Sequence, residues 1–362
     1  MQNKTYFTRK NLIAISLAFL YGLMLVFTGL CIDAEHNFVS KKNPINELAQ
    51  GMKFKEITAG LGGFLVLILV PLIVIEHNIT KILFAILTCV LSGIGSYEVI
   101  NTMYLESPEL KRYRVLVPIL SSLLCGLTLL ATYMTSLDIV NIKENFIYHF
   151  FVLVFFMFSL CLVFGLMIFT KNSEARAIMG CILALTYSGL LFGYVFSLRY
   201  LKPVVLNGDL INLNGLKSFA YVYSIVVATD TFAYFLGIKF GKTKLCPTIS
   251  PKKSVFGACA GFVAGIIFGV AVAFLLGIVK TTSLKDTLLA ILVVAVISGF
   301  ISIVVQLGDL IESKLKRSFN VKDFGNIFPG HGEVLDRFDS FIYAGTWFYI
   351  IIQLIQLIML GV

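Results

Sequence analysis

The residues best suited to chemistry lie in one polar stretch, residues 306–340, between two long apolar runs near the carboxyl end. In this stretch Asp309 and Glu312 are three residues apart, as are Asp336 and Asp339, so each pair shares a face if its segment is helical. Paired carboxylates suit a hydrated Mg²⁺ ion that also binds phosphate oxygens. The alternative, an amphipathic helix at the membrane interface, accounts for the basic residues of this stretch but gives the aspartates no role.

Basic side chains are interleaved with these acids, and Lys and Arg next to a divalent metal are typical of phosphate binding. Lys316, Arg317 and Lys322 are the first candidates. Residues 329–332 have the sequence PGHG, which predicts a tight turn that lets the backbone approach a ligand closely. The stretch therefore predicts a binding site for a phosphorylated ligand.

A second polar loop ends in Ser250, Lys253 and Ser254, just before an apolar run that begins at residue 255. If a helix starts near Ser254, its free N–H groups add partial positive charge, and the loop becomes a candidate phosphate cradle. A solvated loop that carries positive-inside charge is the alternative.

Asp230 is the third candidate, because it lies in the middle of the apolar run 219–238. A carboxylate at such a depth is costly unless it is paired. We interpret Asp230 as a functional residue that faces an interior site. The alternative is a buried ion pair that only fixes helix packing.

Long apolar helices must position these side chains. Of the 362 residues, 58% are hydrophobic and 14% are charged, against about half and about a quarter in soluble domains. The apolar residues form ten runs, each about twenty residues long, which is the length of a membrane-spanning helix. We therefore predict an all-α, polytopic integral membrane protein with about ten transmembrane helices. The runs are 12–32, 57–75, 82–100, 115–134, 146–170, 177–198, 219–238, 255–279, 287–307 and 341–360.

Lys and Arg are concentrated in the loops after the odd-numbered runs, which the positive-inside rule assigns to the cytoplasm. These loops include the candidate residues after runs seven and nine. We predict two parts, N-terminal transmembrane helices at 1–210 and a C-terminal catalytic part at 211–362 with its signature at 308–339. The net charge of +9 fits such loops, and no basic run alternates with aromatics, so nucleic acid is not an expected partner.

These residues resemble the signature of the phosphatidate cytidylyltransferases, or CDP-diacylglycerol synthases. The spacing agrees throughout, and the resemblance covers residues 230–340, under a third of the chain. Glu333 stands where the family has a second glycine after the histidine, and Lys252 stands where it has a glycine. The matching segments are DTFAY at 230–234, SPKKS at 250–254, GDLIES at 308–313, SKLKR at 313–317, KDFG at 322–325, PGHG at 329–332 and DRFD at 336–339.

The resemblance implies a Mg²⁺-dependent transfer of a cytidylyl group from CTP to phosphatidic acid, which yields CDP-diacylglycerol and pyrophosphate. It also implies a multi-pass protein of the bacterial cell membrane, surrounded by membrane lipids, with its site facing the cytoplasm and a homodimer as its candidate assembly.

The resemblance also assigns roles to the candidate residues. Asp309 and Asp336 are the first candidates for metal ligands, followed by Asp339 and Asp230. His331 is expected to support the turn or to donate a hydrogen bond to pyrophosphate rather than to act as a base. The phosphate contacts and remaining candidate site residues are Ser250, Lys253, Ser254, Lys316, Arg317, Lys322 and Arg337.

Three other interpretations stay open. A CTP-dependent transferase that acts on another lipid, such as a polyprenol, would carry the same site. An ion or solute transporter would use Asp230 and Glu98 inside the membrane, but it predicts charges spread over several spans. A homologue with reduced catalysis is suggested only by Glu333.

Overall fold

The structure is a computed structural model of the chain. It describes residues 78–104, 111–136, 142–169, 175–202, 204–206, 211–280, 283–319, 321, 324 and 334–359. The first two predicted spans, 12–32 and 57–75, lie outside the described residues. The division predicted near residue 210 stays a prediction.

In the described part of the chain, eight helical segments are long and apolar enough to cross a membrane. They correspond one to one with the eight spans predicted from residue 82 onward, and the protein is an all-α polytopic membrane protein. The helices are α3 (Asn78–Tyr104), α4 (Tyr113–Ser136), α5 (Ile142–Ile168), α6 (Ala175–Leu183), the π-helix η2 (Ala184–Leu191), α7 (Phe192–Ser197), the 3-10 helix η3 (Leu198–Tyr200), α8 (Gly215–Phe240), α9 (Val255–Leu275), α10 (Leu284–Ser318) and α11 (Val334–Met359).

Two short antiparallel hairpins, which the sequence did not predict, connect some of these helices. Strands β1 (Val204–Leu206) and β2 (Ile211–Leu213) precede α8, and β3 (Lys244–Cys246) and β4 (Ser250–Ser254) join α8 to α9. Pairing satisfies the backbone N–H and C=O groups of connections that cannot continue the helix.

Side-chain caps define where helices begin. Asn214 accepts a hydrogen bond from the backbone N–H of Lys217 at the start of α8, and Ser254 accepts one from Gly257 at the start of α9. Such caps satisfy N–H groups that have no partner within the helix. The helix start expected near Ser254 is confirmed.

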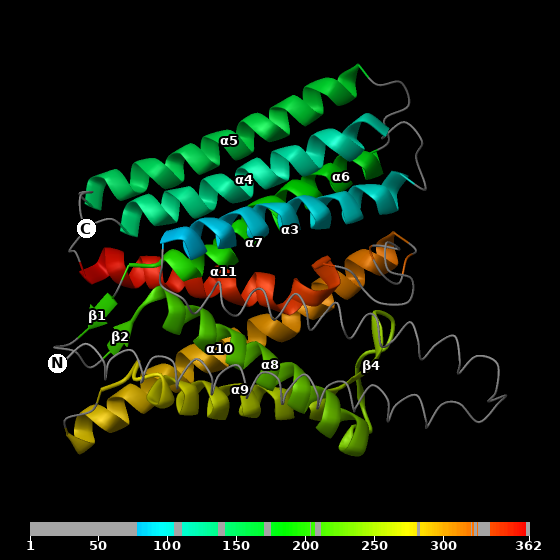
Figure 1. Cartoon of the computed structure of the whole chain (residues 1–362). Coiled ribbons are helices and arrows are strands. Elements are labelled where there is room, and N and C mark those ends of the chain that lie inside the picture. Colours follow the sequence, from blue (N-terminus) through cyan, green and yellow to red (C-terminus); the bar gives the residue numbers. More distant parts are fainter. Residues whose placement is uncertain are drawn as a thin grey trace. The chain divides into compact units, whose positions relative to one another are not determined.

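Close packing between α8 and α9 depends on small residues, as is usual where lipid removes the hydrophobic drive between helices. Gly257 and Gly261 of α9 are buried against α8, and Figure 1 shows the two helices side by side with β4 at one end. A Cβ atom at Gly261 would lie 2.6 Å from the carbonyl oxygen of Thr229, next to Asp230.

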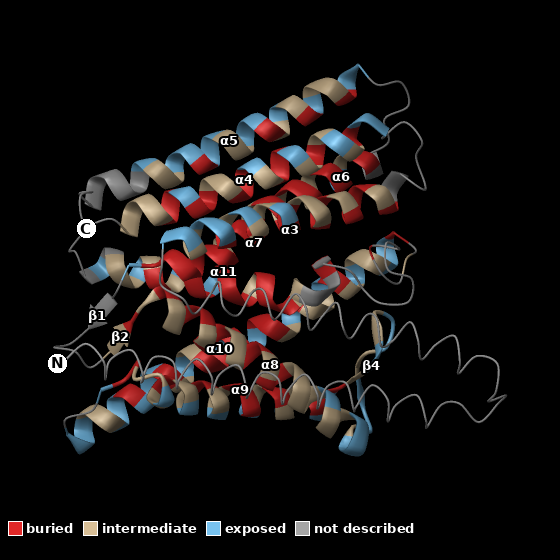
Figure 2. Cartoon of the chain, viewed as in Figure 1, coloured by how far each residue is buried: buried red, intermediate tan, exposed pale blue. Residues whose placement is uncertain are grey.

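Half of the membrane-spanning part of α11 is buried, and the helix packs against α7, α8 and α10 (Figure 2). Helix α5, in contrast, exposes large apolar side chains such as Phe151, Phe158 and Ile168. A helix with an apolar exposed face suits contact with lipid tails.

Helix α10 is longer than its apolar run. The run ends near residue 307, but the helix has 35 residues and continues to Ser318. The continuation places Asp309, Glu312 and Lys316 on one regular helix, as the spacing of the acids required.

Candidate active site

Three helices and one hairpin form the candidate site. Helices α8, α10 and α11 contact one another, and β4 contacts both α8 and α9. Gly308 lets the start of α11 approach α10 closely, because a Cβ atom there would lie 2.9 Å from the side chain of Tyr343 and 3.4 Å from the carbonyl oxygen of Asp339. A glycine beside Asp309 therefore brings the two halves of the signature together.

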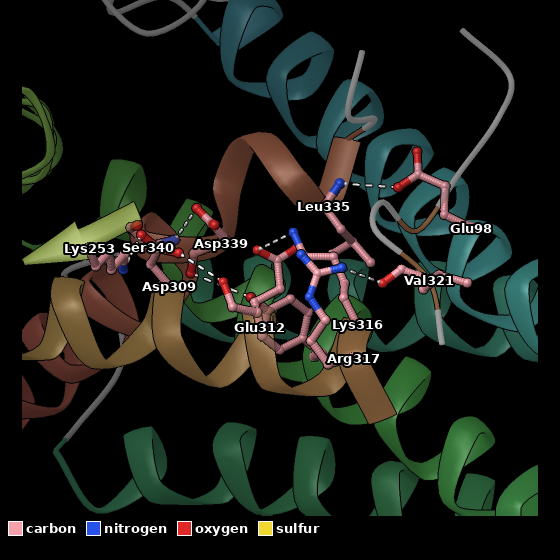
Figure 3. A network of polar contacts seen from close by, with 12 residues as sticks. Glu98, Lys253, Asp309, Glu312, Lys316, Arg317, Val321, Leu335, Asp339 and Ser340 are labelled. Atoms are coloured by element: carbon pink, nitrogen blue, oxygen red, sulfur yellow. Dashed lines mark hydrogen bonds and ion pairs between the residues drawn. The ribbon is translucent and has the colours of Figure 1, made fainter. Parts of the chain in front are cut away.

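Lys253, at the end of β4, forms an ion pair with Asp309 of α10 (Figure 3). The two side chains are 26% and 28% exposed, so the pair is partly open to solvent. The hydroxyl of Ser313 donates a second, longer hydrogen bond of 3.4 Å to Asp309. The structure thus joins two polar stretches that lie far apart in the sequence.

Asp230 of α8 and Asp339 of α11 lie close enough to Asp309 to interact electrostatically with it, and Lys253 is the cation that interacts with Asp230. One oxygen of Asp339 accepts a hydrogen bond of 2.6 Å from the backbone N–H of Ser340. Three aspartates from three different helices therefore share one local environment.

Glu312 belongs to the same group. Its side chain is fully buried, it pairs with Lys316 one turn further along α10 at 3.4 Å, and its carboxyl group interacts with that of Asp339 (Figure 3). A buried carboxyl group is retained only with compensating partners. Since Lys316 is also the neighbouring cation of Asp339, one lysine serves two acids.

We call Asp230, Asp309, Glu312 and Asp339 the acidic cluster. Its four carboxyl groups face two lysines, Lys253 and Lys316. If all six groups are ionised, the four carboxylates exceed the two ammonium groups by two negative charges. Like charges so close together require a proton or a further cation between them.

The donor set matches Mg²⁺ in its chemistry, because that ion prefers carboxylate oxygens and keeps several waters. Within the described ranges, however, no three His, Cys, Asp or Glu side chains converge closely enough to hold a metal ion. The ammonium group of Lys253 lies against Asp309 instead. Asp336 belongs to α11, but its side chain is not among those described.

The other predicted phosphate contacts divide into four groups. Ser254 is only 3% exposed, and its hydroxyl caps α9. Arg317 is exposed and donates to the carbonyl oxygen of Val321 at 3.2 Å. Ser250 pairs with Cys246 in the β3–β4 hairpin. Lys322 and His331 lie outside the described residues, as does the side chain of Arg337.

Two acids have a larger part in the site than the sequence indicated. Glu312 was predicted to pair with Asp309 but was not among the candidate site residues. Glu98 of α3, considered only as a transporter residue, is 2% exposed and accepts a hydrogen bond from the backbone N–H of Leu335. The signal for both was an ionisable residue in or beside an apolar run.

Comparison with known proteins bears on this arrangement directly. The sequence model of the cytidylyltransferase family matches residues 60–355, most of the chain. The chain belongs to the cytidylyltransferase family. It is a membrane-embedded nucleotidyltransferase, and the resemblance seen in its signature is confirmed.

Curated members of the family are similar over about half of this chain. The phosphatidate cytidylyltransferase of Bacillus subtilis is 36% identical over 199 residues, which are 55% of this chain and 67% of that protein. Those of Staphylococcus haemolyticus and one strain of Staphylococcus epidermidis are 37% and 39% identical over 164 residues, 45% of this chain and 55% of each relative. The alignments thus span between about half and two thirds of the relatives' length.

Proposed function

We propose that this cytidylyltransferase transfers the cytidylyl group of CTP to phosphatidic acid, which yields CDP-diacylglycerol and pyrophosphate. The relatives named phosphatidate cytidylyltransferase support this substrate pair. The observation that carries the proposal is the acidic cluster beside Lys253 and Lys316, since carboxylates for a divalent ion and ammonium groups for phosphates occur together.

The reaction joins two anions, so charge neutralisation and alignment matter more than a strong base. An oxygen of the phosphatidic acid phosphate attacks the α-phosphorus of CTP. The new P–O bond forms as the bond between the α-phosphorus and the bridging oxygen breaks, and pyrophosphate leaves with that oxygen and its electron pair. We assign Lys253 and Lys316 to the phosphate oxygens of the two substrates.

We propose Mg²⁺ as the cofactor, with Asp309 and Asp336 as the first ligands and Asp339 and Asp230 beside them. The ion would neutralise charge on the phosphates when bound. The acidic cluster supports this assignment, because its four carboxyl groups face only two lysines and a divalent cation would balance the excess negative charge. In this proposal, Lys253 leaves Asp309 to meet the incoming phosphates.

We propose that the site faces the cytoplasm and that the protein lies in the bacterial cell membrane. The concentration of Lys and Arg in the loops on the side of the site supports this orientation. The apolar helices would let the lipid tails remain in the bilayer while the phosphate enters the site. Whether the enzyme is a homodimer stays a prediction from the family.

The test is a turnover assay with the purified full chain in mixed micelles, radiolabelled CTP, phosphatidic acid and Mg²⁺. We expect label in a CDP-lipid, its loss with EDTA, and a fall of about 100-fold or more in kcat for Asp309→Asn. Asp286→Asn is the matched control, because Asp286 lies in the first turn of the same helix, at the end far from Asp309, where its carboxylate accepts a hydrogen bond from the hydroxyl of Ser283.

Two outcomes would contradict the proposal. If a polyprenol or another phospholipid is labelled when offered as acceptor, and phosphatidic acid is not, the enzyme acts on a different acceptor lipid. Full Mg²⁺-dependent turnover in Asp309→Asn would remove this aspartate from the metal site.

A further inference from the structure

Glu98 is a buried acid on α3, a helix outside the signature. Its side chain accepts a hydrogen bond of 3.1 Å from the backbone N–H of Leu335, the second residue of α11 (Figure 3). Glu98 is 2% exposed and Leu335 is fully buried, so water has little access to this bond. Removing a carboxyl group from water is costly unless strong partners replace it.

The start of α11 is a favourable partner for a carboxylate. The first N–H groups of a helix have no acceptor within the helix, and the helix dipole adds partial positive charge at that end. Glu98 therefore acts as a helix cap that is supplied by another helix. A carboxylate in this position also resists the rotation or fraying of the first turn of α11.

Thr102, one turn after Glu98 on α3, contacts the segment that follows α10. Its hydroxyl bonds to the carbonyl oxygen of Phe324, and also to that of Glu98 at 2.9 Å. Thr102 is 5% exposed and Phe324 is 2% exposed. One face of α3 thus holds the chain where it has left α10 and again where it enters α11.

Packing supports the same contact. A Cβ atom at Gly95, one turn before Glu98, would lie 3.0 Å from the side chain of Leu335. The small residue allows α3 to lie directly against the start of α11. The hydrogen bond of Glu98 and the contact at Gly95 therefore hold the same residue from neighbouring turns.

The position of the first turn of α11 also determines where Asp339 of the acidic cluster lies. Leu335 and Asp339 are four residues apart on α11, so they lie on the same face about one turn apart. Asp339 interacts with Glu312 and with Asp309, both on α10. A change in where α11 begins would therefore move Asp339 relative to its partners.

We propose that Glu98 is a positioning residue of the cytidylyltransferase reaction, which fixes the start of α11 and thereby the placement of Asp339 against α10. The inference rests on the proposed function for its kinetic consequence. Its structural part, the capping of α11, is measurable without substrate.

The experiment compares Glu98→Ala, Glu98→Gln and Ser92→Ala in the purified full chain. Ser92 is the matched control, because it is fully buried on the same helix and donates a hydrogen bond to the carbonyl oxygen of Ser188 on η2 at 2.7 Å rather than to a residue of α11. Hydrogen exchange measured by mass spectrometry reports on the peptide that contains residues 334–340. Initial rates at varied Mg²⁺ and CTP report on the site.

For Glu98→Ala we expect about tenfold faster exchange in the first turn of α11, a fall in kcat of about tenfold or more, and a higher Mg²⁺ concentration for half-maximal rate. Glu98→Gln keeps a carbonyl acceptor and should lie between Glu98→Ala and the wild type. Ser92→Ala should change neither the exchange at residues 334–340 nor the Mg²⁺ dependence.

Unchanged exchange at residues 334–340 in both Glu98 variants would overturn the inference, as would an equal effect of Ser92→Ala on kcat and Mg²⁺ dependence. If Glu98→Ala does not fold, hydrogen exchange and initial rates of Glu98→Gln test the inference instead. A wild-type protein that forms no CDP-lipid would refute the proposed function, while the exchange data would still decide whether Glu98 caps α11.

Discussion

Replacing Ser254 by Ala separates a structural role of this hydroxyl from a direct contact with substrate. The Ser254 hydroxyl accepts a hydrogen bond from the backbone N–H of Gly257 at 3.2 Å and donates to the carbonyl oxygen of Gly237 at 3.3 Å. It thus caps α9 and links the start of α9 to α8. Lys253 precedes it directly, so the cap also holds the backbone from which this lysine reaches Asp309.

The cost of the substitution follows from these two bonds. Loss of a serine cap typically costs about 1 kcal/mol. The carbonyl oxygen of Gly237 keeps a second donor, the N–H of Gly241 at 3.0 Å, so losing the long bond from Ser254 should add only about 0.5 kcal/mol. We therefore expect Ser254→Ala to lower the free energy of unfolding by about 1 to 2 kcal/mol.

Unfolding by SDS titration in mixed micelles, followed by circular dichroism, measures this change. Ser283→Ala is the matched control. The hydroxyl of Ser283 caps α10 by accepting a hydrogen bond from the backbone N–H of Asp286, also at 3.2 Å, and Ser283 is exposed. Both variants should lose stability, but only Ser254→Ala should lower turnover, by about two- to fivefold through a less well placed Lys253. A Ser254→Ala protein as stable as the wild type, with a KM for CTP raised more than about tenfold, would refute the capping argument and assign the hydroxyl to the nucleotide.

Two further predictions concern the site and the packing that builds it. Lys253→Met should lower kcat/KM for CTP by about 100-fold in initial-rate measurements, since a charge-assisted contact to phosphate is lost; unchanged KM and kcat would exclude this role. Gly261→Val should destabilise the protein by about 2 to 3 kcal/mol in SDS titration, because its Cβ atom would meet the carbonyl oxygen of Thr229 at 2.6 Å. Gly165→Val is the control, since no atom lies within 4 Å of its added Cβ, and equal effects of the two would contradict the packing of α9 on α8.

The membrane-spanning helices could be predicted because their signal is local. An apolar run of about twenty residues suffices to indicate a span, and the eight described spans agree with the predicted runs from residue 82 onward. The helix start after Ser254 was predictable for the same reason, since a capping serine and the apolar run lie next to each other. The two short hairpins carry no comparable local pattern and were missed.

The residues of the candidate site and the family could also be predicted from the sequence, because carboxylates and lysines at signature spacing lie close together along the chain. The family assignment that rested on those residues is confirmed by the match over residues 60–355. Spacing further showed that Asp309 and Glu312 share a face of α10, which required only that the helix continue past its apolar run.

The partners of these side chains come from distant segments, so no local pattern specifies them. Lys253 meets Asp309 because glycines let α9, α8 and α10 pack closely, and Asp230 joins them from a third helix. The sequence suggested Glu98 only as a residue of an ion pathway, whereas the structure shows it accepting a hydrogen bond from Leu335 at the start of α11. Sequence spacing indicates which residues share a face of one helix, whereas the crossing of helices determines which faces meet.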